Sequence, residues 1–320
     1  MAQQRPLIPD VSHLYQWMDD GNALLSFRFT SEDILTIVQH SRLPLDIRTA
    51  HRDRCGAFEA VCLTLLRLSF PTRLHTIQLL VGRSYTAICR IVLHTIEALY
   101  QLHGGLLRLS EHYHTHDKLR EFANAISLAS DGVVPSIWGF VDGTLIRICR
   151  PVRGQRPFYS GRIRQHCLNY PALVSPDGML YVYPPSPGSR HDSAILRLSG
   201  LHNDIQRVAL GTDLFIYGDG GYPNTNVILR PFRNPDEDQL VFNRTMSNLR
   251  ASVEWSFHWW KTLSTQLMLR GQQRVLLSPL GQIHMVSAFF HNLHNCIYRN
   301  QVSKRFDMVP PTVAEYLHRL

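Results

Sequence analysis

The sequence predicts a mixed fold, in which a helical N-terminal region precedes a part of the chain that combines strands and helices. Apolar residues recur at helical spacing from Ala57 to Leu99, whereas the residues after Asp131-Gly132 form short runs rich in β-branched and aromatic side chains. Two long helical segments follow these runs. Strands, then a strand between helices, then long helices is a pattern typical of α+β or mixed α/β proteins.

The N-terminal apolar stretch predicts three helices with tight joints at Phe70-Pro71 and Gly82-Arg83-Ser84. Pro71-Thr72 opens the second helix, and Ser84 caps the third, which we expect from Tyr85 to Tyr100. This spacing is typical of a helix-turn-helix-like segment, about 57–99, or of an ordinary helical bundle. In the first case the third helix would present Arg83, Tyr85, Thr86 and Arg90 to DNA.

The second part of the chain predicts strands joined by short turns and followed by helices. We place a domain boundary after Asp131, with an N-terminal helical region at 1–131, a catalytic domain at 132–305 and a tail at 306–320. The expected strands are Ile137–Val141, Ile146–Cys149, Cys167–Ser175, Leu180–Tyr183 and Leu214–Tyr217, with a turn at Pro176-Asp177-Gly178 and a loop over 223–238. The expected helices are Asp192–Leu198, Met246–Leu267 and Pro279–Tyr298.

The chain is basic and rich in arginine. Lys and Arg total 33 against 25 Asp and Glu, for a net charge of +8 and an isoelectric point near 9.4. Only Lys118, Lys261 and Lys304 are lysines, so 30 of the cations are arginines, which bind phosphate in a bidentate manner. A polyanion such as nucleic acid or a membrane surface is the expected partner, although codon usage explains the arginine excess equally well.

Cysteine spacing and hydropathy exclude other classes. The six cysteines include no Cys-x-x-Cys pair, which argues against a zinc finger and favours a reducing compartment. The first residues lack the apolar core of a signal peptide, and no apolar run approaches the roughly 18 residues that span a bilayer. We therefore expect a soluble, intracellular protein with no membrane partner.

Four acidic residues stand at the ends or within the predicted elements. Asp142 closes the run Trp138–Val141, Asp192 opens a helix, Asp219 follows a buried strand and Glu254 lies in the long helix. Acids that follow parallel strands meet at one edge of a sheet, and such a cluster repels itself unless a cation lies between its members. Each acid also has an ordinary explanation, as a turn, a helix cap or an ion-pair partner.

These acids stand within motifs that resemble the PIF/Harbinger-type DDE transposases and the nucleases derived from them. The matching stretches, in chain order, are Asp142-Gly-Thr, Pro187-Gly-Ser-Arg-His-Asp-Ser193, Gly218-Asp-Gly-Gly-Tyr-Pro223 and Arg250-x-x-x-Glu254 with Lys261. Asn169 and Leu293-His-Asn295 resemble the same pattern. The likeness spans roughly 136–300, and it departs at Ser247, His258 and Thr262–Gln266, which puts strand handling and full transposition in doubt.

The resemblance implies an RNase H-like catalytic domain with a central mixed five-stranded sheet flanked by helices. It implies cleavage and joining of DNA phosphodiester bonds by a two-metal mechanism, with Mg²⁺ or Mn²⁺, at a triad of Asp142, Asp219 and Glu254. Asp192 is the fourth candidate ligand, and the choice between Asp192 and Asp219 as the essential second aspartate stays open. It also implies a nuclear protein that works with a separate Myb-like DNA-binding protein; the oligomeric state, a homo-oligomer included, stays open.

Cations accompany the acids in the sequence. Arg250 and Lys261 share a helix face with Glu254 because they lie 4 residues before and 7 after it. No acid stands between Thr144 and Pro176, and we expect the arginines there to form a phosphate-binding wall for double-stranded DNA, although a solvated loop is the alternative. The candidate DNA contacts are Arg147, Arg150, Arg153, Arg162, Arg164, Arg250 and Lys261.

Two other functions compete with a metal-dependent nuclease. One is a domesticated DNA-binding protein that keeps the transposase fold and is catalytically inert. The other is an unrelated metallohydrolase built on His191-Asp192, against which the absence of companion histidines at metal-ligand spacing counts.

Overall fold

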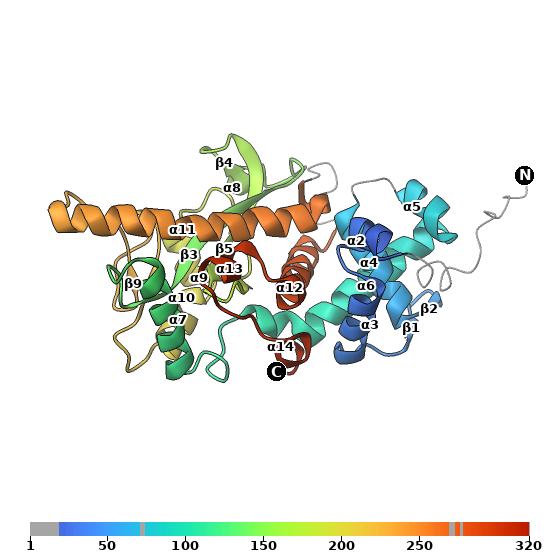
Figure 1. The fold of residues 1–320 in the computed structure, drawn as a ribbon. Coiled ribbons are helices and arrows are strands. Elements are labelled where there is room, and N and C mark those ends of the chain that lie inside the picture. Colours follow the sequence, from blue (N-terminus) through green and yellow to red (C-terminus); the bar gives the residue numbers. More distant parts are fainter. Residues whose placement is uncertain (1–18, 71–73, 269–272, 276–277, 320) are drawn as a thin grey trace, which may run out of the picture.

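The N-terminal region of the protein is helical. The structure, a computed structural model, describes residues 19–70, 74–268, 273–275 and 278–319 (Figure 1). Its first elements are α2 (Asp20–Phe27), α3 (Ser31–His40), a hairpin of β1 (Asp46–Arg48) and β2 (Arg54–Gly56), α4 (Ala57–Ser69), α5 (Leu74–Val81), α6 (Tyr85–His103), the short 3₁₀ helix η1 (Gly104–Leu107) and α7 (His116–Ala129).

Helices α4, α5 and α6 correspond to the three helices that the sequence predicts. The side chain of Ser84 caps α6 by accepting a hydrogen bond from the Ala87 amide at 3.3 Å, and α6 runs three residues beyond the expected end. The opening predicted at Pro71-Thr72 lies outside the described residues. Two of the cations expected to point outward are held by the protein itself: Arg83 pairs with Glu59, and Arg90 pairs with Asp53 at 2.6 and 2.8 Å.

The sheet of the second part is mixed and carries seven strands, where five were expected. The strand order is β4-β5-β3-β8-β9, and β6 and β7 also pair with β5. Strand β3 is antiparallel to β5 and parallel to β8. The strands are β3 (Ile137–Arg147), β4 (Tyr159–Ser160), β5 (Gln165–Val174), β6 (Leu180–Val182), β7 (Ser186–Pro187), β8 (Phe215–Tyr217) and β9 (Ile228–Leu229).

Strand β3 corrects the prediction of two separate strands, Ile137–Val141 and Ile146–Cys149. The segment Asp142-Gly143-Thr144 has the composition of a turn, yet it stays in the ladder, with Asp142 opposite Ala172 and Thr144 opposite Tyr170. Asp142 therefore lies in the middle of β3 and does not close a strand. A carboxylate is tolerated there because Arg250, from another element, binds it.

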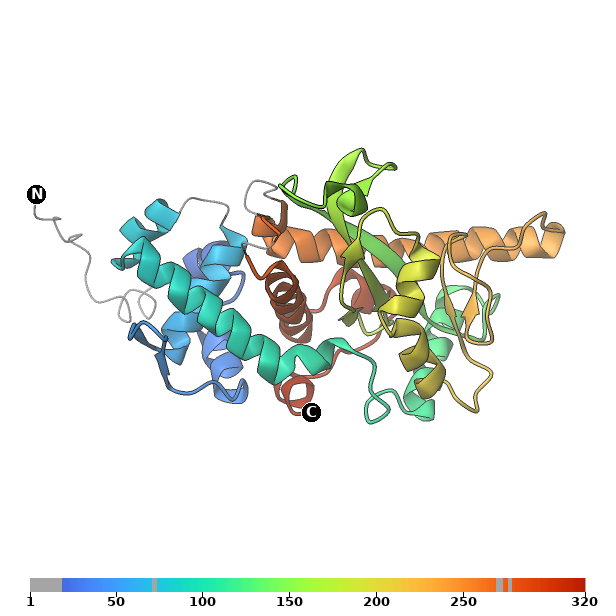
Figure 2. The same cartoon turned by 180° about the vertical axis from the view of Figure 1, so that it is seen from behind.

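Helices cover both sides of the sheet. The long helix α11 crosses the side that faces the viewer in Figure 1, and α9 and α10 stand in front in Figure 2. Helix α9 begins and ends where the sequence predicts, whereas α11 begins nine residues before the expected Met246, because Asp236 and Gln239 form a capping box. The remaining helices are α8 (Gln155–Phe158), α9 (Asp192–Leu198), α10 (Leu201–Val208), α11 (Glu237–Leu263), the 3₁₀ helix η2 (Thr265–Met268), α12 (Leu280–Tyr298), α13 (Gln301–Arg305) and α14 (Val313–Leu317).

The two halves of the chain share one hydrophobic core. Helix α12 packs against α6, where Phe289 stacks on His103 with ring centroids 5.1 Å apart. Phe290, also on α12, lies against Phe29 at 6.4 Å. The segment 306–320, which we expected as a tail, includes α14, and its buried Tyr316 packs against Phe289.

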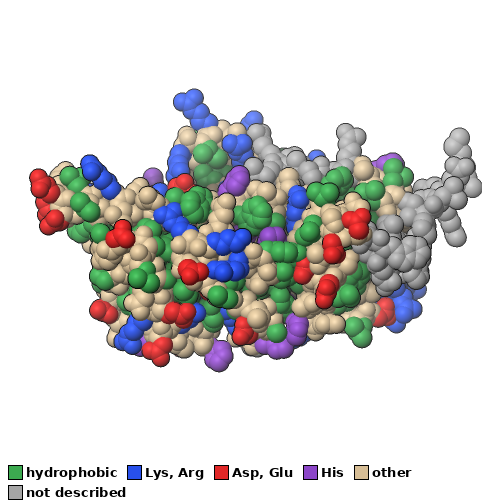
Figure 3. Space-filling view, in the orientation of Figure 1, with side chains coloured by type: hydrophobic (Ala, Val, Ile, Leu, Met, Phe, Trp, Pro, Cys, Tyr) green, Lys and Arg blue, Asp and Glu red, His purple; other side chains and the backbone are tan. Residues whose placement is uncertain are grey.

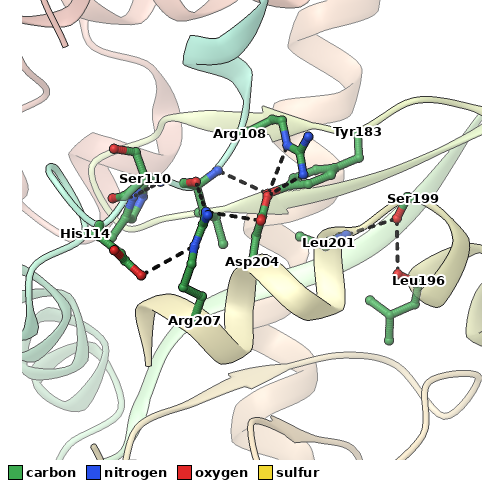
Figure 4. A network of polar contacts seen from close by, with 11 residues as sticks. Arg108, Ser110, His114, Tyr183, Leu196, Ser199, Leu201, Asp204 and Arg207 are labelled. Atoms are coloured by element: carbon green, nitrogen blue, oxygen red, sulfur yellow. Dashed lines mark hydrogen bonds and ion pairs between the residues drawn. The ribbon is translucent and has the colours of Figure 1, made fainter. Parts of the chain in front are cut away.

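A polar network ties α10 to the segment that follows α6 (Figure 4). The Asp204 carboxylate is 9% exposed and accepts hydrogen bonds from Arg108, Arg207 and the hydroxyl of Tyr183, at 3.1, 3.1 and 2.7 Å. Arg207 also donates to the carbonyl oxygen of Leu109 at 3.2 Å. Because two cations and a hydroxyl surround this buried acid, it fixes α10 beside the sheet.

Candidate active site

Three aspartates line one cavity of about 840 Å³ at the edge of the sheet. Asp142 comes from the middle of β3, Asp192 from the first residue of α9 and Asp219 from the loop after β8. The phenol of Tyr222 is buried beside them, and burial together with the charges of Asp192, Asp142 and Asp219 raises its pKa well above the usual value. The parallel pairing of β3 and β8 carries Asp142 and Asp219 to the same place.

The side chain of Asp142 is largely buried, 17% exposed. Its Oδ1 accepts the Gly143 amide at 2.8 Å, and its Oδ2 accepts a charged hydrogen bond from Arg250 at 2.7 Å. The pKa of Asp142 is raised to about 6, chiefly by burial and in part by Asp219 and Asp192, while Arg250 and the Gly143 amide oppose the rise. The ionised form of Asp142 is therefore disfavoured by its surroundings, and a cation bound beside it would stabilise that form.

Asp192 lies between the other groups. Its Oδ1 accepts a hydrogen bond from the Asn169 amide nitrogen at 3.0 Å. A Cβ atom placed on Gly221 would lie 3.7 Å from Asp192 Oδ2 and 3.1 Å from Asp219 Oδ1, so both carboxylates border the same glycine. Asp219 Oδ1 also accepts the Gly221 amide at 2.9 Å.

Helix α11 brings Glu254 and Arg250 to the cavity. The Glu254 side chain is 64% exposed, and Arg250 donates to it at 3.4 Å. Arg250 thus contacts both Asp142 and Glu254. Its contact with Glu254 is the i,i+4 pair predicted on the helix, and its contact with Asp142 links the helix to β3, 108 residues earlier in the chain.

Lys261, two turns further along α11, lines the same cavity and forms hydrogen bonds with residues of β3. Its Nζ donates to Thr144 Oγ1 at 2.7 Å and to the Leu145 carbonyl at 3.3 Å. Burial, with the charge of Arg147, lowers its pKa. These bonds fix α11 against the strand that carries Asp142.

The arginines of the acid-free segment are exposed, and two of them line cavities near the aspartates. Arg162 lines the cavity of the aspartates, and Arg150 lines a neighbouring one of about 870 Å³. Figure 3 shows Lys and Arg side chains over the projection that α8 and β4 form in Figure 1. Arg147, Arg150, Arg153, Arg162 and Arg164 are all exposed.

The donor set of the site consists of oxygen atoms. Among the residues that the structure describes, no three His, Cys, Asp or Glu side chains are arranged to hold a metal ion. Carboxylate oxygens are nevertheless the ligands that Mg²⁺ and Mn²⁺ prefer, and Asn169 Oδ1, which faces the same cavity, is buried without a hydrogen-bond partner in the described part of the chain. The chemistry of these donors fits a hard divalent cation.

The sequence analysis included Asn169 in the motifs that resemble the transposase family, but it did not assign Asn169 to the active site. The signal was present: Asn169 is a polar residue within the apolar run of β5, and it is 6% exposed. Asn295, from the other stretch of the pattern, lies elsewhere; it donates to the Asp177 carbonyl at 2.9 Å and holds the turn that precedes β6.

Comparison with known proteins agrees with this geometry. Residues 141–295, slightly less than half of the chain, match the family model of the DDE superfamily endonucleases. No curated protein and no solved structure matched. The matched segment begins beside Asp142 and contains every acid of the cavity, and it supports a DDE transposase-like family and a nuclease that acts on phosphodiester bonds.

The mixed α/β architecture, with a multistranded mixed sheet between helices, fits a DDE nuclease fold. In the described part of the chain, none of the helices is both long enough and apolar enough to cross a bilayer.

Proposed function

We propose that this protein is a metal-dependent DNA endonuclease or transposase that cleaves and joins phosphodiester bonds at an Asp/Asp/Glu site. The observation that carries the proposal is the meeting of Asp142, Asp192 and Asp219 in one cavity within the segment that matches the endonuclease family. Glu254 enters the same cavity from α11. Such a cluster has no structural value of its own, because like charges at short range destabilise a fold.

Asp142, Asp219 and Glu254 are the proposed metal-binding triad, with Asp192 as a fourth ligand, and the proposed cofactor is a pair of Mg²⁺ or Mn²⁺ ions. When bound, such ions would activate the attacking oxygen, stabilise the leaving oxygen and neutralise charge on the phosphoryl group. Arg250 donates to both Asp142 and Glu254 and holds them in place, and Lys261 anchors α11 against β3. Movement of the Arg250 guanidinium away from Asp142 would free the carboxylate oxygen for a ligand.

The exposed arginines around the cavity are the proposed contacts to the phosphates of double-stranded DNA. The position and the exposure of these arginines support this role. Arg162 lines the cavity itself, and the same acid-free segment contains Arg147, Arg150, Arg153 and Arg164. Arg250 and Lys261, which we also expected to contact DNA, bind protein groups in this structure. A phosphate interface predicts that binding weakens steeply as salt concentration rises.

The family lineage and cellular setting belong to the same proposal. The four motifs support the PIF/Harbinger lineage, and a strand β3 antiparallel to β5 and parallel to β8 supports an RNase H-like topology for 132–305. We further propose that the helix-turn-helix-like segment 57–99 contributes to DNA binding, and that the protein acts in the nucleus with a separate Myb-like protein.

One observation favours a second function, a DNA-binding protein that is catalytically inert. Arg250 occupies Asp142 Oδ2 at 2.7 Å and competes with a metal ion for that oxygen. In this case the exposed arginines would bind DNA as before, and the acids would serve only to position Arg250.

Nicking of supercoiled plasmid in Mg²⁺ or Mn²⁺ distinguishes the two functions. We expect the parent protein to nick, and Asp142→Asn and Asp219→Asn each to reduce the rate at least about 100-fold, because each removes a charged metal ligand. Asp213→Asn is the matched control: Asp213 is exposed at the opposite end of β8 from Asp219 and should keep the parent rate. DNA binding without nicking would favour the inert protein, and nicking that survives both site variants would overturn the assignment.

A further inference from the structure

We propose that the side-chain oxygen of Asn169 is a metal ligand, which together with Asp192 holds a divalent cation above Gly143. The inference rests on the proposed metal-dependent site and deepens it, since it adds a neutral oxygen donor that no acidic motif contains. It is based on the buried Asn169 Oδ1, which has no hydrogen-bond partner in the described residues, and on Gly143, which lies against Asn169 Oδ1 and Asp192 Oδ1.

The orientation of the Asn169 carboxamide is fixed by its neighbour. Its nitrogen lies 3.0 Å from Asp192 Oδ1, and only the nitrogen can donate to a carboxylate, so the oxygen must face the other way. That oxygen is buried and has no hydrogen-bond partner within the described residues. An unsatisfied buried acceptor costs about 1–3 kcal/mol, so a bound group that satisfies it is favoured.

Gly143 allows the oxygens of Asn169 and Asp192 to pack directly against the strand backbone. A Cβ atom on Gly143 would lie 2.9 Å from Asn169 Oδ1 and 2.9 Å from Asp192 Oδ1. Gly143 lies in an ordinary strand, paired with Pro171, so its backbone conformation does not require glycine. The absence of a side chain at this position therefore allows Asn169 Oδ1 and Asp192 Oδ1 to lie close to each other over the backbone of β3.

The donor chemistry accounts for the arrangement of the acids. No three His, Cys, Asp or Glu side chains in the described ranges are arranged to hold an ion by themselves, whereas an amide oxygen is a ligand of hard cations that complements carboxylates without adding charge. A neutral donor limits the repulsion around Asp142, Asp192 and Asp219. The side chain of Asn169 lines the same cavity as the three aspartates.

Binding of Mn²⁺, followed by its electron paramagnetic resonance and by isothermal titration without DNA, tests the inference. Asn169→Ala should lower the affinity at least about 10-fold, and Asn169→Asp should bind at least as tightly as the parent protein, because a carboxylate oxygen replaces the amide oxygen. Gly143→Ala should also weaken binding, because the new methyl group would lie 2.9 Å from each oxygen and push the two donors apart. Gly220→Ala is the matched control, since its Cβ would meet nothing within 4 Å.

The outcomes separate this inference from the proposed function. If Asn169 only orients Asp192 by hydrogen bonding, Asn169→Asp loses that bond, places two carboxylates together and binds Mn²⁺ more weakly than Asn169→Ala; this result would overturn the inference, as would parent-like affinity in Asn169→Ala. A parent protein that binds no Mn²⁺ overturns both proposals. Mn²⁺ binding through Asn169 in a protein that nicks no DNA upholds the inference and overturns only the nuclease.

Discussion

Buried histidines make the stability of this protein dependent on pH. His114, His284 and His291 are 2% exposed or less, and burial lowers the pKa of each to about 3. An unfolded histidine titrates near 6.5. Below pH 6.5 the unfolded chain takes up protons that the folded chain does not, so stability is fully present above about pH 6.5 and is lost as the pH falls toward 3.

The size of the effect follows from these values. At pH 5 each of the three histidines lies about 1.5 units below its unfolded pKa and contributes a loss of about 2 kcal/mol, or about 6 kcal/mol together. Asp142, whose pKa is raised to about 6, opposes this by about 1 kcal/mol, because the folded state binds its proton more readily. The net loss of about 5 kcal/mol is comparable to the whole stability of many domains.

Urea unfolding followed by tryptophan fluorescence at pH 7, 6 and 5, at constant ionic strength, measures this loss. His291→Leu should reduce the pH slope by about 1.4 kcal/mol per unit, and it leaves no polar atom unpaired because neither ring nitrogen of His291 has a partner in the described structure. The exposed His75, changed to Leu, is the control and should follow the parent curve. An unfolding midpoint that does not change between pH 7 and pH 5 would refute the reasoning.

Two further predictions concern stability, both measured by urea unfolding at pH 7. Arg83→Ala should cost about 3 kcal/mol, because it leaves the carboxylate of Glu59, 7% exposed, without its cation; Arg120→Ala, which breaks an exposed pair, should change stability by less than about 0.5 kcal/mol, and equal losses would contradict this. Gly178→Ala should cost at least about 3 kcal/mol, because φ is +78° and the new Cβ would lie 2.3 Å from Asn300 Oδ1. Gly154→Ala, at φ +63° in open space, should cost about 1 kcal/mol, and a similar loss at both glycines would show that the contact does not matter.

The elements that the sequence predicts well are those that local chemistry determines. The N-cap at Ser84 and the bounds of α9 (Asp192–Leu198) depend on residues within one turn of the helix end, and both are confirmed. The start of α11 also has a local signal, the capping box of Asp236 and Gln239. The prediction missed it because the first turns of the helix are polar and lack the apolar periodicity on which the prediction depended.

The parts that were not predicted depend on contacts between distant residues. Asp142 has the local appearance of a strand end, but it pairs with Ala172 of β5 and its carboxylate is bound by the guanidinium of Arg250, 108 residues later. The helical pattern predicted that Arg250 and Glu254 share a face, but it carries no information on what that face touches. The same limit applies to Asn169, whose partner Asp192 is 23 residues away on another element.

The core that joins the two halves has a consequence for how such a chain evolves. Because Phe289 and Phe290 of α12 pack against Phe29 and His103 of the N-terminal region, the two halves of the chain share part of their interior. Exchange of one half for that of a distant relative would create mismatched side chains across a close-packed boundary. Under the proposed function, new target specificity is therefore expected to arise by substitutions at the exposed arginines rather than by exchange of one half of the chain.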